Sequence, residues 1–166
     1  MLSAQELGQL QSEQYAHDMR NHFDIVALHK QDRLKHYGLH FSKYVGRLAR
    51  GEEEHKPIER TVTDTLLVAL SAANALHQDL RKENFDTCAV DVKVNLFCVF
   101  ADAAGRFADA CEKIDHMEEF VPIARTANRD ILSWVMAEAA ENELDLKGAV
   151  ALRRKELSER QFYIRD

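Results

Sequence analysis

The spacing of apolar side chains along the chain predicts helices. Apolar residues recur at helical intervals through residues 62–80 and again through residues 123–139. Pro57 and Pro122 precede these two stripes, and proline suits the first turn of a helix because its fixed backbone angle is already helical. A single amphipathic helix cannot bury its own apolar stripe, so each stripe needs a partner helix. The pattern is typical of an all-α fold.

Capping signals add further helices. Ser3 and Glu6 form a capping-box pattern, which marks the start of a first helix. Gly51 suits the end of a second helix, because glycine accepts the left-handed backbone that often closes a helix, and Gly38 is expected to weaken or kink this helix. In addition to the two helices that carry the apolar stripes, we expect helices over about residues 3–30, 32–50 and 147–160.

Residues 90–96 carry a second periodicity. Valine and leucine alternate there with aspartate, lysine and asparagine, as they would in a half-buried strand. The run continues without a turn signal into a strongly helical segment, and an isolated strand would have no partner in the chain. We therefore expect one helix over about residues 87–115.

Two segments of the chain are similar in order and spacing. Gly-Arg-Leu-Ala at residues 46–49 recurs as Gly-Arg-Phe-Ala at 105–108, and Pro-Ile-Glu-Arg-Thr at 57–61 recurs as Pro-Ile-Ala-Arg-Thr at 122–126. An aspartate early in each following helix, Asp64 or Asp130, precedes an Asp-Leu pair by fifteen positions. Repeats at this scale are a sign of a duplicated structural unit.

We infer an internal duplication of a helix pair inside a single domain, residues 1–166. The first repeat covers about residues 32–80 and the second about 90–146, followed by the C-terminal helix. Two unrelated amphipathic helix pairs are the alternative interpretation. If the duplication is real, the two pairs should pack about a pseudo-twofold axis and form a bundle of five to six helices.

The composition and net charge of the chain exclude several classes of fold and function. The chain has six glycines and two prolines in 166 residues, too few for the many tight turns of a sandwich or barrel. Its net charge of −6 disfavours general binding to nucleic acid or to an anionic membrane, and the N-terminal residues do not resemble a signal peptide. We expect a cytoplasmic protein. Cys88, Cys98 and Cys111 lack metal-ligand spacing and are expected to be buried free thiols.

The repeated pattern resembles a known family. A Gly-Arg-Leu-Ala segment, a loop, a helix with an early aspartate and an Asp-Leu pair fifteen residues later are similar to the all-α nucleotide pyrophosphohydrolases of the MazG and dCTP pyrophosphatase type. The resemblance covers roughly residues 34–80 and 96–160. It implies a helical bundle that binds a nucleotide or a related phosphorylated small molecule, with Mg²⁺-dependent hydrolysis of nucleoside triphosphates as the family activity. A homodimer is compatible with the sequence.

The resemblance also assigns residues. The family holds Mg²⁺ with an E-x-x-E motif and an E-x-x-D motif, whose carboxylates share a helix face and neutralise the cations that bridge phosphate oxygens. Here the first motif reads Tyr44-x-x-Arg47 and Ala103-x-x-Arg106, and only Asp64 and Asp130 remain of the second. Asp64 and Asp130 are therefore the expected metal ligands. The side chains expected to contact phosphate are Lys43, Arg47, Arg106 and Arg153, the last replacing a family lysine.

Two interpretations of the arginines stay open at this point. Arg47 and Arg106 lie where the family has metal ligands, so they could offer positive charge directly to an anionic ligand through forked hydrogen bonds. Alternatively, each arginine could pair with Asp64 or Asp130, which would make the chain a non-catalytic helical module for interaction or regulation.

Histidines provide a third hypothesis, a metal-binding bundle. His36 and His40 are four residues apart on one expected helix, as are Glu112 and His116 on another. Residues at this spacing share a helix face and could together hold a transition metal.

Overall fold

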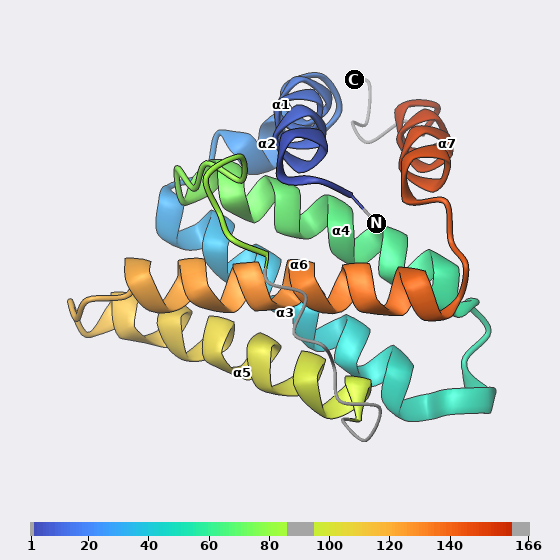
Figure 1. Ribbon diagram of the computed structural model, residues 1–166. Coiled ribbons are helices and arrows are strands. Elements are labelled where there is room, and N and C mark those ends of the chain that lie inside the picture. The colour runs from blue at the N-terminus through green and yellow to red at the C-terminus, as the bar shows by residue number, and fades with distance from the viewer. Residues whose placement is uncertain (1, 86–94, 161–166) are drawn as a thin grey trace.

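The computed structural model describes residues 2–85 and 95–160, and this part of the chain is helical and contains no strand. The predicted all-α bundle is confirmed (Figure 1). The elements are α1 (Ala4–Asn21), α2 (Phe23–Val26), α3 (Lys30–Arg50), the short 3-10 turn η1 (Gly51–Glu53), α4 (Ile58–Ala75), α5 (Leu96–Asp115), α6 (Val121–Glu141) and α7 (Leu146–Ser158).

Helices α3 to α6 form a four-helix bundle. Consecutive helices pair as α3 with α4 and α5 with α6, and the two pairs meet through α3 against α5 and α4 against α6. Within these four contacts the partners run in opposite directions, as the colours of Figure 1 show. Such an arrangement agrees with two helix pairs related by a pseudo-twofold axis. The duplication itself stays a prediction.

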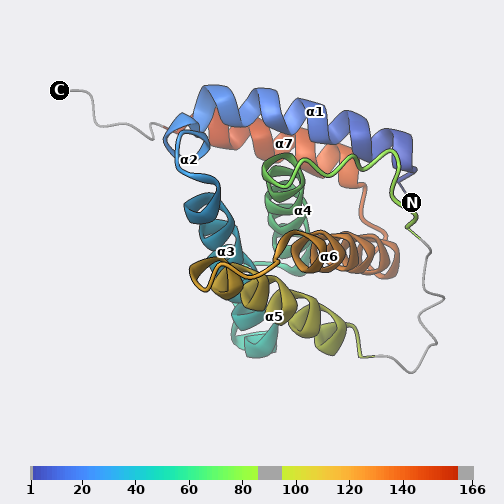
Figure 2. The same ribbon diagram turned by 90° about the vertical axis from the view of Figure 1, so that its left-hand side faces the viewer.

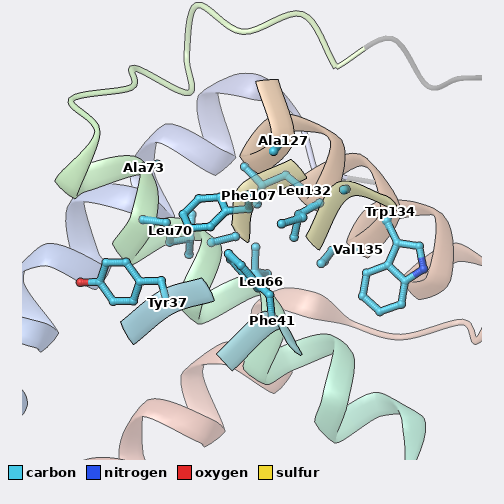
Figure 3. Close-up of a cluster of buried hydrophobic side chains, with 14 of the residues drawn as sticks. Tyr37, Phe41, Leu66, Leu70, Ala73, Phe107, Ala127, Leu132, Trp134 and Val135 are labelled. Carbon is cyan, nitrogen blue, oxygen red and sulfur yellow. The ribbon is translucent and has the colours of Figure 1, made fainter. Parts of the chain in front are cut away.

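Aromatic side chains from both pairs fill the centre of the bundle. The rings of Phe41 and Phe107 meet edge to face with centroids 5.0 Å apart, and those of Phe100 and Trp134 stack at 4.2 Å. Figure 3 shows Leu66 and Leu132 among the neighbouring buried side chains. The expectation that Gly38 weakens or kinks the helix is wrong, because α3 continues through it; a Cβ atom at this glycine would make an ordinary contact of 3.6 Å with the Cys111 sulfur on α5.

Helices α1 and α7 lie side by side across the bundle (Figure 2). Both contact α4, which also packs against α3 and α6, and α4 is consequently buried around most of its circumference. This explains its composition: Ala69, Ala72 and Ala73 allow close packing on several sides, and Thr65 satisfies its hydroxyl by donating to the Thr61 carbonyl at 2.7 Å. Helix α4 is thus the central element of the fold.

Two predicted helix boundaries are wrong. The first helix ends at Asn21 rather than near residue 30; the His22 amide bonds the Asp18 carbonyl, and the chain turns through α2 before α3 begins. The fourth helix begins at Leu96, because the Asn95 side chain accepts a hydrogen bond from the Phe97 amide and caps it. Residues 86–94, which hold most of the strand-like alternation, lie outside the described residues.

Gly51 and the cysteines were also assigned from the sequence, and the structure confirms some of these assignments and corrects others. Gly51 closes α3 at a positive φ of 54°, as predicted. Cys111 is buried, whereas Cys98 is exposed, which corrects that expectation; Cys88 lies outside the described residues. Over residues 2–85 and 95–160, none of the helices is both long and apolar enough to cross a bilayer.

Candidate functional site

A cavity of about 490 Å³ lies between α1, α2, α3, α4 and α7. Its volume is in the usual range for sites that bind small molecules and cofactors. Basic side chains gather where the C-terminal half of α3 faces the start of α4, and buried polar groups from α1 lie at the other end. The basic lining residues are Lys43, Arg47, Lys56, Arg60, Arg153 and Arg160.

Asp64 is held between two arginines at the basic end. Arg47 donates from Nη1 to one carboxylate oxygen at 3.2 Å, and Arg153 donates from Nε to the other at 2.8 Å. All three residues are more than 90% buried. They come from α3, α4 and α7, so a polar cluster joins three helices where ion pairs are poorly screened. The cluster carries one net positive charge at the cavity wall.

Further positive charge surrounds this cluster. Lys43 and Lys56 are exposed at the cavity, and within the described chain neither side chain forms a salt bridge with a carboxylate. Arg60 is already engaged, because it donates to the Glu156 carboxylate at 2.7 Å. Arg160 also lines the cavity. Charge therefore remains uncompensated here although the whole protein is acidic.

Histidines connect Lys43 to the middle of the cavity. Lys43 donates from Nζ to His40 Nδ1 at 3.0 Å, and His40 Nε2 lies 3.2 Å from His36 Nε2. An imidazole that accepts from an ammonium group is neutral, so His40 carries its proton on Nε2 and donates it to His36. Burial, followed by the charge of Lys43, lowers the pKa of His40 to about 4. The pKa of Lys43 is lowered as well, first by burial and then by Arg47.

The opposite end of the cavity contains a buried carboxylate. Asp18 on α1 accepts from Gln14 Nε2 at 2.8 Å and from the Ser71 hydroxyl at 2.6 Å. Gln14 is fixed in this orientation because its own oxygen accepts from Arg154. Burial raises the pKa of Asp18. His22 and Asp24 lie at the same end and make contacts of their own.

The second half of the chain has a corresponding ion pair, which lies away from the cavity that contains Asp64. Arg106 donates to Asp130 at 2.9 Å and to Asp102 at 2.8 Å, while Arg129 also reaches Asp130. The side chains of Arg106 and Asp130 are 36% and 30% exposed. Neither lines the cavity that contains Asp64. The two arginine–aspartate pairs are thus alike in composition but differ in burial.

The expected magnesium ligands do not fit that ion. Both oxygens of Asp64 already accept from guanidinium groups, and Asp130 lies elsewhere with two arginines of its own. Mg²⁺ requires several oxygen ligands in near-octahedral geometry, and an adjacent arginine repels it. The other predicted ligand set is also divided: His36 and His40 line the cavity, whereas the exposed side chains of Glu112 and His116 pair with each other at the C-terminal end of α5. Among the described residues no three metal-ligating side chains of the His, Cys, Asp and Glu types form a group.

One half of the cavity could be predicted from the sequence. Lys43, Arg47, Arg153 and Asp64 come together as candidate site residues, whereas Arg106 and Asp130 do not join them. The acidic end was missed. Its signal was present in the sequence, because the apolar stripe of α1 continues at helical spacing into Gln14, His17 and Asp18, three polar residues that are buried.

Comparison with protein-family models, with curated proteins and with solved structures gives no significant match for the chain. The resemblance to the MazG-type pyrophosphohydrolases therefore stays a prediction based on the residues alone.

Proposed function

We propose that the protein binds a small phosphorylated ligand, a nucleotide or a related molecule, in the cavity beside Asp64 without a metal ion. The observation that carries the proposal is the group of basic side chains around the Arg47–Asp64–Arg153 cluster, in which Lys43 and Lys56 lack carboxylate partners within the described chain. Phosphate oxygens accept strong hydrogen bonds from such groups, and partial exclusion of water strengthens the attraction.

The Asp64 carboxylate has a specific part in this proposal. It holds the two arginines in fixed positions before the ligand arrives, so less side-chain entropy is lost on binding. Arg47 retains donors that Asp64 does not use, as does Arg153, which also reaches Glu156. The proposed ligand would sit against these donors and the lysines rather than replace Asp64.

The alternative of a non-catalytic interaction module is favoured by one observation, the pairing of arginine with aspartate in both halves of the chain. Under that alternative, however, the buried pair should fill the site. The cavity beside Asp64 instead remains open at about 490 Å³. This open volume favours ligand binding in the first half, and the partly exposed pair of the second half fits a structural role.

Isothermal titration calorimetry with pyrophosphate and nucleoside monophosphates, in buffer containing EDTA, tests the proposal. Two charge-reducing variants make a matched comparison: Lys43→Ala with Lys56→Ala removes cavity charges, and Lys82→Ala with Lys155→Ala removes exposed charges outside the cavity. Loss of hydrogen bonds to a charged ligand should weaken binding by about tenfold or more in the first variant only. Equal affinity in both variants, or no binding by the unaltered protein, contradicts the proposal.

A further inference from the structure

Asp18 and Asp64 lie at opposite ends of the cavity, and α4 provides a measure of the distance between them. Asp64 is itself on α4, and Asp18 bonds Ser71, which lies seven residues further along the same helix. Seven residues are two helical turns, so Asp64 and Ser71 face the same side about 10 Å apart along the axis. A ligand whose phosphate contacts the basic end can therefore present a second group to Asp18.

The wall between the two ends is apolar and aromatic. Leu67 and Val68 on α4 line the cavity between Asp64 and Ser71, and Tyr37 and Tyr44 line it from α3. Such a surface suits the sugar and the faces of a nucleobase, because aromatic and aliphatic side chains favour flat apolar groups. In a nucleoside monophosphate, the sugar separates the phosphate from the hydrogen-bonding edge of the base by a comparable length.

Asp18 has unused hydrogen-bonding capacity. Among the described residues, one donor bonds each carboxylate oxygen, Gln14 or Ser71, although each oxygen has two lone-pair sites. No lysine or arginine in the described chain forms a salt bridge with Asp18, although the residue is only 7% exposed. A buried acceptor of this kind gains most from a ligand donor, since such a donor reduces the cost of its desolvation.

We infer that the cavity selects nucleotides whose base carries an exocyclic amino group, as cytosine and adenine do. The selective contact is a hydrogen bond from that amino group to Asp18, and the inference rests on the proposed function. Uracil and hypoxanthine have a carbonyl oxygen at the corresponding position. That oxygen would face a carboxylate oxygen, and the two acceptors repel each other. Phosphate at the basic end gives affinity, and Asp18 gives selectivity among bases.

Two pairs of nearly isosteric ligands test the inference by calorimetry: CMP against UMP, and AMP against IMP. Sites that hydrogen-bond a ligand group reject analogues lacking it, so we expect a preference of about tenfold or more for the amino-bearing member of at least one pair. Equal affinity within both pairs overturns the inference but leaves the proposed function intact. Failure of all four nucleotides and of pyrophosphate to bind overturns the proposed function as well.

Asp18→Asn supplies the residue-specific test. The asparagine oxygen can accept from Gln14, and its amide can donate to the Ser71 hydroxyl, which in turn can donate to the Leu67 carbonyl 3.1 Å away. The variant therefore keeps a partner for Gln14 and for Ser71, and its second N–H is left to donate to a ligand in the cavity that residue 18 lines. We expect the preference to shrink or reverse toward UMP or IMP while affinity for pyrophosphate is unchanged. A preference that persists at its original size contradicts the role of Asp18.

Discussion

Replacing Asp64 with asparagine should destabilise the protein far more than the same change at Asp130. Asp64→Asn preserves the side-chain shape but removes the carboxylate that Arg47 and Arg153 share, at a site where all three residues are more than 90% buried; Arg153 keeps its ion pair with the partly exposed Glu156. Removing one partner of a buried ion pair typically costs about 3–5 kcal/mol, because the remaining charge is desolvated and unpaired. Asp130→Asn affects side chains that are 30–36% exposed, and such pairs contribute about 0–1 kcal/mol.

Urea unfolding followed by far-ultraviolet circular dichroism measures both changes. If the free energy of unfolding falls with urea at about 2 kcal/mol per molar, the Asp64→Asn midpoint should drop by about 1.5–2.5 M and the Asp130→Asn midpoint by less than about 0.5 M. Because the two positions correspond in the predicted repeat, each variant is the control for the other. Midpoints that fall equally would refute the reasoning that burial distinguishes the two clusters.

Gly51→Ala should lower the free energy of unfolding by about 1–2 kcal/mol in urea titrations, because φ is 54° and no neighbour contacts an added Cβ; an unchanged midpoint would contradict this. His40 has a pKa of about 4 when folded and an ordinary value of 6.5, so protons bind the unfolded chain more readily and stability should fall from pH 6.5 to 4. The His40→Gln variant should lose less stability over this pH range than the unaltered protein. Identical profiles of stability against pH for the two proteins would contradict the assignment to His40. Iodoacetamide should label exposed Cys98 well before buried Cys111, because burial raises the pKa of the Cys111 thiol to about 11. Mass spectrometry of the labelled peptides measures the order, and labelling of Cys111 first would contradict the prediction.

The fold could be predicted where local signals and periodicity agree. The stripe after Pro57 and the one after Pro122 became α4 and α6, because a proline at the start and apolar residues at helical spacing indicate the same element. The break after Asn21 was not predicted, since no glycine or proline marks it. Asn95 was overlooked as a cap because the alternating pattern before it continues into Leu96.

The candidate site was only half predictable for a different reason. Lys43 and Arg47 are four residues apart, so one helix face brings them together without any knowledge of packing. Asp18 reaches the cavity only because α1 lies across α4 and meets Ser71, a contact between residues 53 positions apart. Long-range contacts of this kind depend on how helices dock, and local periodicity does not determine that. The contact of Arg153 with Asp64 is also long-range, and local periodicity does not predict it; Arg153 was assigned to the site from the family resemblance.

A crystal structure of the protein with CMP, grown in the presence of EDTA, tests the central claim most directly. We predict electron density for the phosphate against Lys43, Arg47 and Arg153, with the Asp64 carboxylate still bonded to both arginines and no metal between them. An occupied site elsewhere on the molecule, with the cavity beside Asp64 unchanged, would contradict the claim, and so would a phosphate that displaces Asp64 from its two arginines.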